Sequence, residues 1–354
     1  MKKILIFNPF GIGDVLFTTP LIRNLKTNFD EASISYICNR RTYPLLKNNI
    51  FLDKVFVFEK DEWRACARES KWAMVKKFCA FFSAIRKEKF DIVFDLSLNS
   101  QYGFFLKAAG IKQRIGYNYK NRGRFLTRKI PLPQGYNDKH IARYYLNLLN
   151  FLDITPQDYN FDVFLSPASL DKGLKILEEQ NIGKSDFIVG VCPGAGDSWG
   201  ETAYFKRWPK EYFLKLSEIL QNKLSAKIIL FGSKAEGNIC EYIYNNMEQK
   251  PLNLCGKITL EDFIGLISQC GLVIANDGGP FHIAQALQKK TAVFYGPVND
   301  RVYGPYPDEK NCVVFKRELN CRPCYNKFRF PGCARDKKCL RDISVEEVFA
   351  KIFR

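Results

Sequence analysis

The segment Leu272-Val-Ile-Ala-Asn276-Asp277-Gly278-Gly279-Pro280-Phe281-His282 decides the fold class of this 354-residue chain. It joins the apolar run of a buried strand to a helix whose first position suits Pro280. Free N–H groups at the start of such a helix, together with the helix dipole, favour a phosphate group. Two glycines let a diphosphate approach the backbone without a side-chain clash. The order of strand, glycine pair and capped helix therefore favours a phosphate site over a plain tight turn.

Outward from this segment, short apolar runs alternate with helix-period segments, which is typical of an α/β protein with parallel sheets. We expect strands in two groups of four, at residues 4–7, 34–37, 55–58 and 92–96, and at residues 187–192, 227–231, 272–276 and 291–295. Helical spacing predicts an amphipathic helix over 211–222. The boundary candidate is 153–167, which has two prolines and no helical period. We expect two α/β domains facing each other across a cleft, with the site at the carboxyl ends of the strands.

The composition, with 46% hydrophobic and 26% charged residues, is that of a globular protein and excludes a disordered or fibrous one. No run approaches the roughly 18 apolar residues of a membrane-spanning helix. The apolar start at Ile4–Phe7 is too short for a signal peptide, and no small-residue cleavage site follows it. We therefore expect a soluble, cytoplasmic protein whose thiols stay reduced.

The net charge of +17 predicts acidic partners. Residues 112–129 carry seven bases and no acid, residues 316–341 nine bases and two acids, and residues 60–89 nine bases and four acids. We interpret 60–89 as a solvated face, whereas 112–129 fits a solvated loop or an anion-binding surface equally well. Its aromatic residues would suit nucleic acid. No helix-turn-helix, RNA-recognition or zinc-finger pattern occurs, so we expect no nucleic-acid partner.

The first strand runs into Gly11-Ile12-Gly13-Asp14 and then a helix. A dinucleotide fingerprint requires a third glycine where Leu16 stands, and no Gly-Lys-Ser/Thr follows, so neither NAD nor a P-loop nucleotide is indicated. Asp14 has two equally weighted roles. It is either an N-cap that accepts backbone N–H bonds or a carboxylate general base.

Further loops follow strands of the second half. Lys206 or Arg207 would neutralise a leaving phosphate, or both are ordinary exposed bases. Glu236 would bind a ribose diol or favour a helix start. We interpret His282 as a structural hydrogen-bonding residue, and with His140 as the only other histidine a His-based triad has little support.

Four of these motifs resemble, in order and over nearly the whole chain, the family 9 glycosyltransferases, the ADP-heptose:lipopolysaccharide heptosyltransferases. They are Gly11-Ile-Gly-Asp14-Val-Leu-Phe-Thr-Thr-Pro20, Lys206-Arg-Trp-Pro209, Gly232-Ser-Lys-Ala-Glu236 and Asn276-Asp-Gly-Gly-Pro-Phe-His-Ile-Ala-Gln-Ala-Leu287. The resemblance implies a GT-B fold of two Rossmann-like domains. Residues 1–165 would bind the acceptor, residues 166–342 the nucleotide sugar, and residues 343–354 would form a C-terminal helix.

The resemblance also implies inverting, metal-independent transfer of heptose from ADP-heptose to a lipopolysaccharide core. Asp14 would deprotonate the acceptor hydroxyl, and Lys206 would assist as the second catalytic residue. The donor would be held by Gly194, Ala195, Lys206, Glu236, Ile258, Asp277, Gly278 and Gly279, with Ile258 at the adenine, and the acceptor by Gly13, Arg122 and Arg124. The chain contains no Asp-x-Asp, and positive side chains with a helix N-terminus can stabilise the leaving diphosphate instead. We expect no cofactor to be required for catalysis.

A lipid-anchored anionic acceptor fits the basic segment 112–129, so we expect peripheral attachment to the inner face of the inner membrane without insertion. Alternatives are a transferase for another sugar or a nucleotide-sugar epimerase of the same fold. From other classes, a basic nucleic-acid-binding protein with a zinc module would explain the charge but not Asp14 or Asn276–Pro280. A non-catalytic sugar-binding protein would tolerate Asp14→Asn.

A cysteine-rich segment, 321–339, departs from the simplest heptosyltransferases. Cys321 and Cys324 have metal-ligand spacing, but five residues separate Cys333 from Cys339, which is wider than usual. A structural Zn or Fe site, unligated thiols and a disulfide pair remain open.

Overall fold

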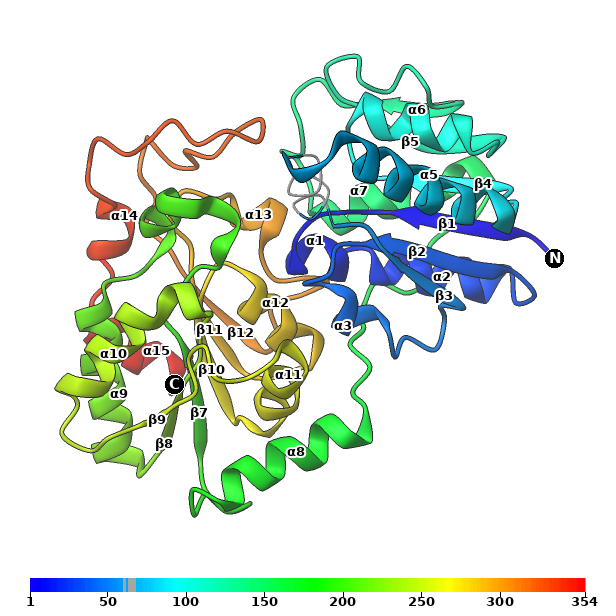
Figure 1. Ribbon diagram of the computed structural model, residues 1–354. Helices are drawn as coiled ribbons and strands as arrows, with labels where there is room; N and C mark the ends of the chain where they lie inside the picture. Colours follow the sequence, from blue (N-terminus) through cyan, green and yellow to red (C-terminus); the bar gives the residue numbers. More distant parts are fainter. Residues whose placement is uncertain (60–61, 63–67, 354) are drawn as a thin grey trace. The chain divides into compact units, whose positions relative to one another are not determined.

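The structure is a computed structural model that describes residues 1–59, 62 and 68–353. The chain divides into two compact units, Met1–Phe164 and Leu165–Arg354. Each unit is built on a six-stranded sheet in which every strand pair is parallel, with helices against the sheet (Figure 1). The prediction of an α/β protein with parallel sheets is thus confirmed.

The sheet of unit 1 has the order β3-β2-β1-β4-β5-β6. Its strands are β1 (Lys3–Phe7), β2 (Ser33–Cys38), β3 (Lys54–Val57), β4 (Ile92–Asp95), β5 (Gln113–Asn118) and β6 (Arg128–Pro131). Its helices are α1 (Ile12–Leu16), α2 (Thr19–Asn28), α3 (Tyr43–Leu46), α5 (Lys71–Glu88), α6 (Ser100–Ala108) and α7 (Ile141–Asn147), followed by the 3-10 turn η1 (Leu148–Leu152).

The sheet of unit 2 has the order β12-β11-β10-β7-β8-β9. Its strands are β7 (Ile188–Cys192), β8 (Lys227–Leu230), β9 (Leu252–Asn253), β10 (Leu272–Asn276), β11 (Thr291–Phe294) and β12 (Cys312–Phe315). Its helices are α8 (Pro167–Glu178), α9 (Lys210–Leu224), α10 (Gly237–Asn246), α11 (Leu260–Gln269), α12 (Gly279–Ala286), α13 (Asp300–Tyr303), α14 (Lys338–Arg341) and α15 (Val345–Ile352), with 3-10 segments η2 (Asp197–Lys206) and η3 (Lys234–Glu236).

Both sheets have the same doubly wound topology. Counted within its own unit, each runs 3-2-1-4-5-6, the order of a dinucleotide-binding Rossmann sheet. In such a sheet the connections leave in opposite directions between the first and fourth strands, which opens a crevice at their carboxyl ends. The crevice position lies between β1 and β4 in unit 1, and between β7 and β10 in unit 2.

All eight predicted strands are present, whereas β5, β6, β9 and β12 were not predicted. The basic segment 112–129 is therefore not a plain loop, because it contains β5 and the start of β6. Both strands carry arginine or lysine and too few apolar residues to form a run. In the basic segment 60–89, residues 60–61 and 63–67 lie outside the described residues, and most of the remaining residues form α5.

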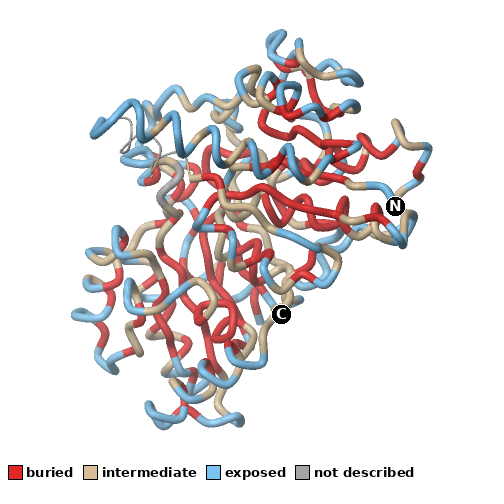
Figure 2. The backbone as a smooth tube through the Cα atoms, turned by 45° about the vertical axis from the view of Figure 1, so that its right-hand side comes forward, coloured by how far each residue is buried: buried red, intermediate tan, exposed pale blue. Residues whose placement is uncertain are grey.

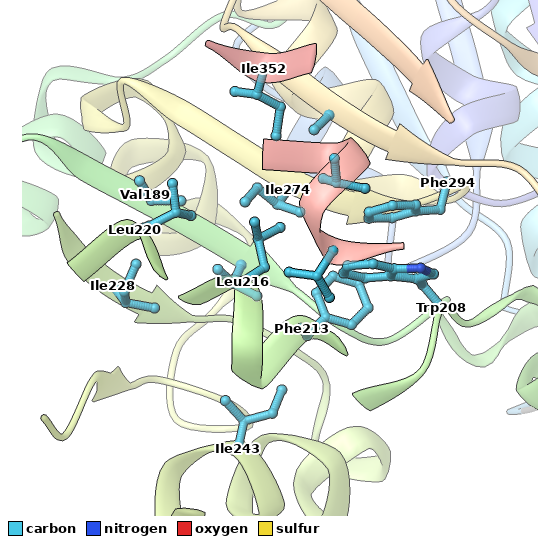
Figure 3. Packing of buried hydrophobic residues seen from close by; sticks show 14 of the residues in the cluster. Val189, Trp208, Phe213, Leu216, Leu220, Ile228, Ile243, Ile274, Phe294 and Ile352 are labelled. Carbon is cyan, nitrogen blue, oxygen red and sulfur yellow. The ribbon is translucent and has the colours of Figure 1, made fainter. Parts of the chain in front are cut away.

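The central strands of each sheet are buried, whereas the edge strands are half-buried or exposed and the outer sides of the helices are exposed (Figure 2). In unit 2, Trp208 stacks on Phe294 with ring centroids 4.2 Å apart and lies edge-on to Phe213 (Figure 3). Its indole N–H donates to the Ile343 carbonyl at 3.0 Å. Ile352 of α15 belongs to the same core, so the C-terminal helix packs onto unit 2. None of the helices in the described ranges has the length and apolar character that crossing a bilayer requires.

Candidate active site

The candidate site of unit 2 lies where β7 and β10 end side by side. Cys192, the last residue of β7, pairs with Ala275 of β10, so Pro193 and Asn276 leave the sheet at the same level. The loop after β7 continues through Gly194, Ala195 and Gly196 into η2. Two groups of predicted donor residues, Gly194 with Ala195 and Asp277 with Gly278 and Gly279, are thus brought to one edge of one sheet, as the topology requires.

Asn276 ties these loops together. Its side chain is 1% exposed. Its oxygen accepts from the Trp208 N–H at 2.8 Å, and its amide group donates to the Pro193 and Gly194 carbonyls at 2.9 and 2.8 Å. Only an amide supplies both an acceptor and two donors in this way. Asn276 was quoted within a motif but was not predicted as a site residue, and only the structure shows its role.

Lys206 and Asp277 form a buried ion pair, with Nζ 2.8 Å from Oδ2 and side chains 7% and 5% exposed. Trp199 lies under the ammonium, 4.9 Å from ring centroid to Nζ. His282 Nε2 lies 3.9 Å from the other Asp277 oxygen. Burial, and secondly the charge of Lys206, lower the pKa of His282 to about 3. The imidazole is therefore neutral at pH 7, and Lys206 is the cation that balances Asp277.

Glu236 is buried and holds the loop after β7 against the loop after β8. One carboxylate oxygen accepts from the N–H groups of Ala195 and Gly196 at 2.8 and 2.9 Å, and the other accepts from Ser233 N–H at 2.8 Å. Gly194 must be glycine here, because a Cβ at that position would lie 1.8 Å from Glu236 Oε1. The helix-start alternative for Glu236 is thus confirmed, since it closes a capping box on Ser233.

The glycine pair after β10 opens helix α12. Gly278 is the N-cap and Gly279 the first helical residue. Pro280 therefore occupies the second helical position, and the prediction that it occupies the first is wrong by one residue. A Cβ on Gly278 would lie 3.4 Å from the Ala195 carbonyl oxygen. Ile258, half-buried, directly precedes Thr259, the N-cap of α11.

In unit 1, Asp14 lies on α1, directly after β1. The N-cap of α1 is Gly11, and Asp14 is the third helical residue, so the predicted N-cap role is wrong by three positions. The Asp14 carboxylate nevertheless accepts from the Gly11 N–H at 3.2 Å, which gives it a structural bond. Gly13 precedes it on the same helical turn, half-buried.

A second acid lies at the crevice position of unit 1 and was not predicted. Asp95 ends β4, beside β1, and is 5% exposed. Burial raises its pKa to about 6, against the opposing effect of hydrogen bonds from Ser97. Those bonds come from the Ser97 hydroxyl at 2.6 Å and the Ser97 N–H at 3.1 Å. The apolar run Ile92–Leu96, predicted as a strand, signals the burial of Asp95, but nothing in it marks this acid as a site residue.

The two predicted acceptor arginines lie between β5 and β6 and are both exposed. Arg124 lies over the Phe125 ring, 5.0 Å from its centroid. Arg122 donates its backbone N–H to the Tyr119 carbonyl at 3.0 Å.

The cysteine-rich segment does not assemble the predicted metal site. Among the described residues no three His, Cys, Asp or Glu side chains are grouped to hold a metal ion. Cys339 is packed in the core with Leu340, and Cys324 Sγ donates to the Cys321 carbonyl at 2.8 Å. Neither a Zn nor an Fe site is supported, and the four cysteines are free thiols.

Arginine and aromatic contacts hold this segment instead. The Arg322 guanidinium donates to the Gly296 carbonyl at 2.6 Å and pairs with Asp300 at 3.0 Å. Tyr325 and Phe330 pack on Trp199, with ring centroids 4.9 and 5.3 Å away. The segment therefore packs against the Trp199 ring, which in turn contacts the Lys206 ammonium.

Two doubly wound units of this topology are the architecture of the GT-B glycosyltransferases. Residues 78–332 match the sequence model of glycosyltransferase family 9 (heptosyltransferase), so the chain belongs to this family and is a glycosyltransferase. Both the predicted family and the predicted GT-B fold are confirmed.

Similar proteins cover almost the whole chain. Lipooligosaccharide heptosyltransferase 2 of Campylobacter jejuni is 26% identical over 98% of this chain and 96% of that protein. The crystal structure of a family 9 glycosyl transferase from Veillonella parvula matches with a TM-score of 0.80 at 21% identity, covering 99% of this chain and 95% of that one. The ADP-heptose lps heptosyltransferase II of E. coli matches with a TM-score of 0.76 at 20% identity, covering 100% and 98%.

Proposed function

We propose that this enzyme transfers heptose from ADP-heptose to a lipopolysaccharide core acceptor, with the donor held by unit 2. The observation that carries the proposal is the convergence of Lys206, Asp277 and Glu236 with three glycine-containing loops at the crevice position of one Rossmann sheet. A heptosyltransferase relative that is 26% identical over nearly the full length supports the sugar. A solved relative of the same fold, described as an ADP-heptose enzyme, supports the nucleotide.

The diphosphate would lie at the start of α12. Gly278 and Gly279 carry no side chain to obstruct it, and the first N–H groups of a helix favour an anion. Lys206 would neutralise the charge that develops on the leaving diphosphate, the role that positive groups fill in place of a metal ion. Since its partner Asp277 already fixes the ammonium, little reorganisation accompanies the reaction.

Glu236 would hold the ribose. A carboxylate has about four acceptor directions, and backbone N–H groups use three of them. The remaining direction, on the oxygen that accepts from Ser233, is available to a ribose hydroxyl. Gly194 and Ala195 would line the donor beside it, and Ile258 would contact the adenine.

Asp14 would act as the general base of an inverting transfer. It would remove the proton from the acceptor hydroxyl, whose oxygen attacks the anomeric carbon while the bond to the diphosphate breaks. Because the carboxylate is half-buried and anchored to Gly11 N–H, its orientation is fixed. Gly13 and the exposed Arg122 and Arg124 would contact the acceptor, whose phosphates attract guanidinium groups. We place the enzyme at the cytoplasmic face of the inner membrane, where this acceptor would be anchored.

The test is a turnover assay with purified protein, ADP-heptose and a lipopolysaccharide truncated before the heptose. We expect acceptor-dependent ADP release and an acceptor heavier by one heptose, both abolished in Asp14→Asn. An inverted anomeric centre in the product is expected by NMR. Turnover of a UDP- or GDP-sugar alone would remove the heptose assignment, and ADP-heptose consumption without a glycoside would indicate an epimerase. Absence of both nucleotide-sugar binding and turnover would refute the proposal.

A further inference from the structure

Helix α5 has an apolar side that faces away from the sheet. The inner side of α5 packs in the core of unit 1, since Ile85 is buried and Phe81 packs on Phe58 with ring centroids 5.5 Å apart. Its outer side nevertheless presents Trp72 and Val75, which are 83% and 42% exposed. These two residues stand three apart and so share one side of the helix. A tryptophan this exposed is the largest apolar group that unit 1 offers to solvent within its described residues.

Helix α6 packs against α5 at Phe78 and Phe82 and carries a further exposed aromatic residue. Phe105 packs on Phe78 and Phe82 of α5, with ring centroids 4.3 and 4.9 Å apart, so the two helices lie side by side. Phe104 is 50% exposed and contacts Phe125 at 5.5 Å. We call this surface the aromatic face, made up of Trp72, Val75, Phe82, Phe104, Phe105 and Phe125.

Exposed bases surround the aromatic face. Lys107 and Arg124 lie over the Phe125 ring, 5.9 and 5.0 Å from its centroid. Further exposed bases on α5 and in the turn after β5 are Lys71, Lys76, Lys77, Arg86, Lys120 and Arg122. The nearby acid Glu62 is paired, with Arg40 and Lys77. Glu88 is likewise paired, with Lys54. Glu69, three residues before Trp72, is a further exposed acid. The exposed bases outnumber these acids, so the charge around the face is predominantly positive.

We propose that the aromatic face is a docking surface for an anionic lipid bilayer, with Trp72 and Phe104 inserted at the level of the headgroups. Tryptophan and phenylalanine on one side of a helix, with lysine and arginine beside them, are the composition of helices that lie in the membrane interface. Indole rings favour the headgroup region because they are apolar with one polar N–H. The bases add attraction to acidic headgroups. Attachment then involves insertion, in contrast to the purely electrostatic attachment expected from the sequence.

This inference deepens the membrane placement made under the proposed function by naming the surface involved, although lipid binding itself requires neither donor nor acceptor. The alternative occupant is a second copy of the chain. The positive charge around the face disfavours self-association, since two copies would bring like charges together.

The test is co-sedimentation of the full chain with vesicles of phosphatidylcholine alone or mixed with phosphatidylglycerol. We expect binding to the mixed vesicles, a blue shift of tryptophan emission that disappears in Trp72→Phe, and weakening by salt. The double variant Trp72→Ser/Phe104→Ser should bind at least tenfold more weakly. Lys71→Gln and Lys76→Gln should each weaken binding about fivefold, the equivalent of roughly 1 kcal/mol per base.

The matched control is Tyr244→Ser, which removes an exposed aromatic ring from unit 2 and should leave vesicle binding unchanged. Thermal unfolding of each variant verifies the fold, and ADP-heptose turnover on a lipid-free acceptor separates this inference from the proposed function. Equal binding by the double variant and the wild type would overturn the proposal, as would failure of the wild type to bind mixed vesicles. A dimer in sedimentation velocity that the double variant loses would also overturn it and assign the face to self-association.

Discussion

Replacing Glu236 by glutamine tests whether this carboxylate organises the candidate donor site. Glutamine keeps the size but offers one acceptor oxygen and an NH2 group. With its oxygen toward Ala195 and Gly196, the two bonds of 2.8 and 2.9 Å survive in neutral form. In the wild-type protein the Ser233 N–H lies 2.8 Å from a Glu236 carboxylate oxygen. In the variant it would face the NH2 group of glutamine, which is a donor. One orphaned donor costs about 1–3 kcal/mol, and loss of charge assistance weakens each surviving bond by roughly half a kcal/mol or more.

We therefore expect Glu236→Gln to lower the free energy of unfolding of unit 2 by roughly 3 kcal/mol. For a unit of this size that corresponds to a fall in Tm of roughly 6–12 °C. The assay is urea and thermal unfolding followed by circular dichroism. Glu241→Gln is the matched control, because Glu241 is exposed on the adjoining helix α10 and should cost less than about 0.5 kcal/mol. A Glu236→Gln protein as stable as this control would refute the assigned hydrogen-bond role.

The same variant also distinguishes the structural role of Glu236 in the loops from its proposed role in binding the ribose. If one acceptor direction of Glu236 binds a ribose hydroxyl, wild-type protein should bind ADP about tenfold more tightly than 2′,3′-dideoxy-ADP, since a bond to a charged group contributes about 1.5 kcal/mol or more. Glu236→Gln should largely lose this discrimination. Equal discrimination by both proteins in calorimetric titrations would leave Glu236 with its structural role alone.

Three further predictions follow from the geometry. Asp14→Asn should lower kcat by about 10²–10⁴-fold with little change in donor KM, while the exposed control Asp30→Asn retains activity; equal rates for both would contradict the general-base role. Asn276→Ala should destabilise unit 2 by roughly 2–5 kcal/mol, because it orphans one N–H and two carbonyls, and an unchanged midpoint of urea unfolding would show that the loops hold without it. Because the pKa of Asp95 is about 6 in the folded protein and about 3.8 unfolded, the folded state binds the proton more tightly. The contribution of protonated Asp95 to the free energy of unfolding is therefore lost as pH rises from about 4 to 6, a decrease of roughly 2–3 kcal/mol. Asp95→Asn should remove this pH dependence from the free energy of unfolding measured between pH 4 and 7.

Most of the strands that sequence reasoning found are central strands buried on both faces, and the exception is the edge strand β3, whose sequence Lys54-Val-Phe-Val57 is still mostly apolar. Residues such as Ile4–Phe7 and Leu272–Asn276 lie in the middle of their sheets, where an apolar run is the physical requirement. The strands it missed are the edge strands β6, β9 and β12 and the neighbouring β5. Edge strands need less apolar surface, and β9 has only two residues. β5, β6 and β9 therefore carry no apolar run to detect, whereas β12, Cys312-Val-Val-Phe315, does carry a short run that sequence reasoning overlooked.

The candidate site was foreseen where glycine and charge mark a loop, and missed where the role depends on tertiary contacts. Asp277 and Lys206 stand 71 positions apart in the sequence, and only the parallel topology brings them to 2.8 Å. Asn276 has no local signal, because its three partners come from two other loops. The spacing of Cys321 and Cys324 suggested a metal, but spacing says nothing of the core packing that occupies Cys339.

Hydrogen–deuterium exchange of the full chain with and without ADP locates the nucleotide site. We expect slower exchange in three segments of unit 2 when ADP is bound, namely residues 193–196, 232–236 and 276–279. These segments lie at the carboxyl ends of β7, β8 and β10. Their protection from exchange by ADP should disappear in Asp277→Ala at the same ADP concentration. Protection by ADP that omits all three loops would contradict the assignment of the nucleotide to the crevice position of unit 2.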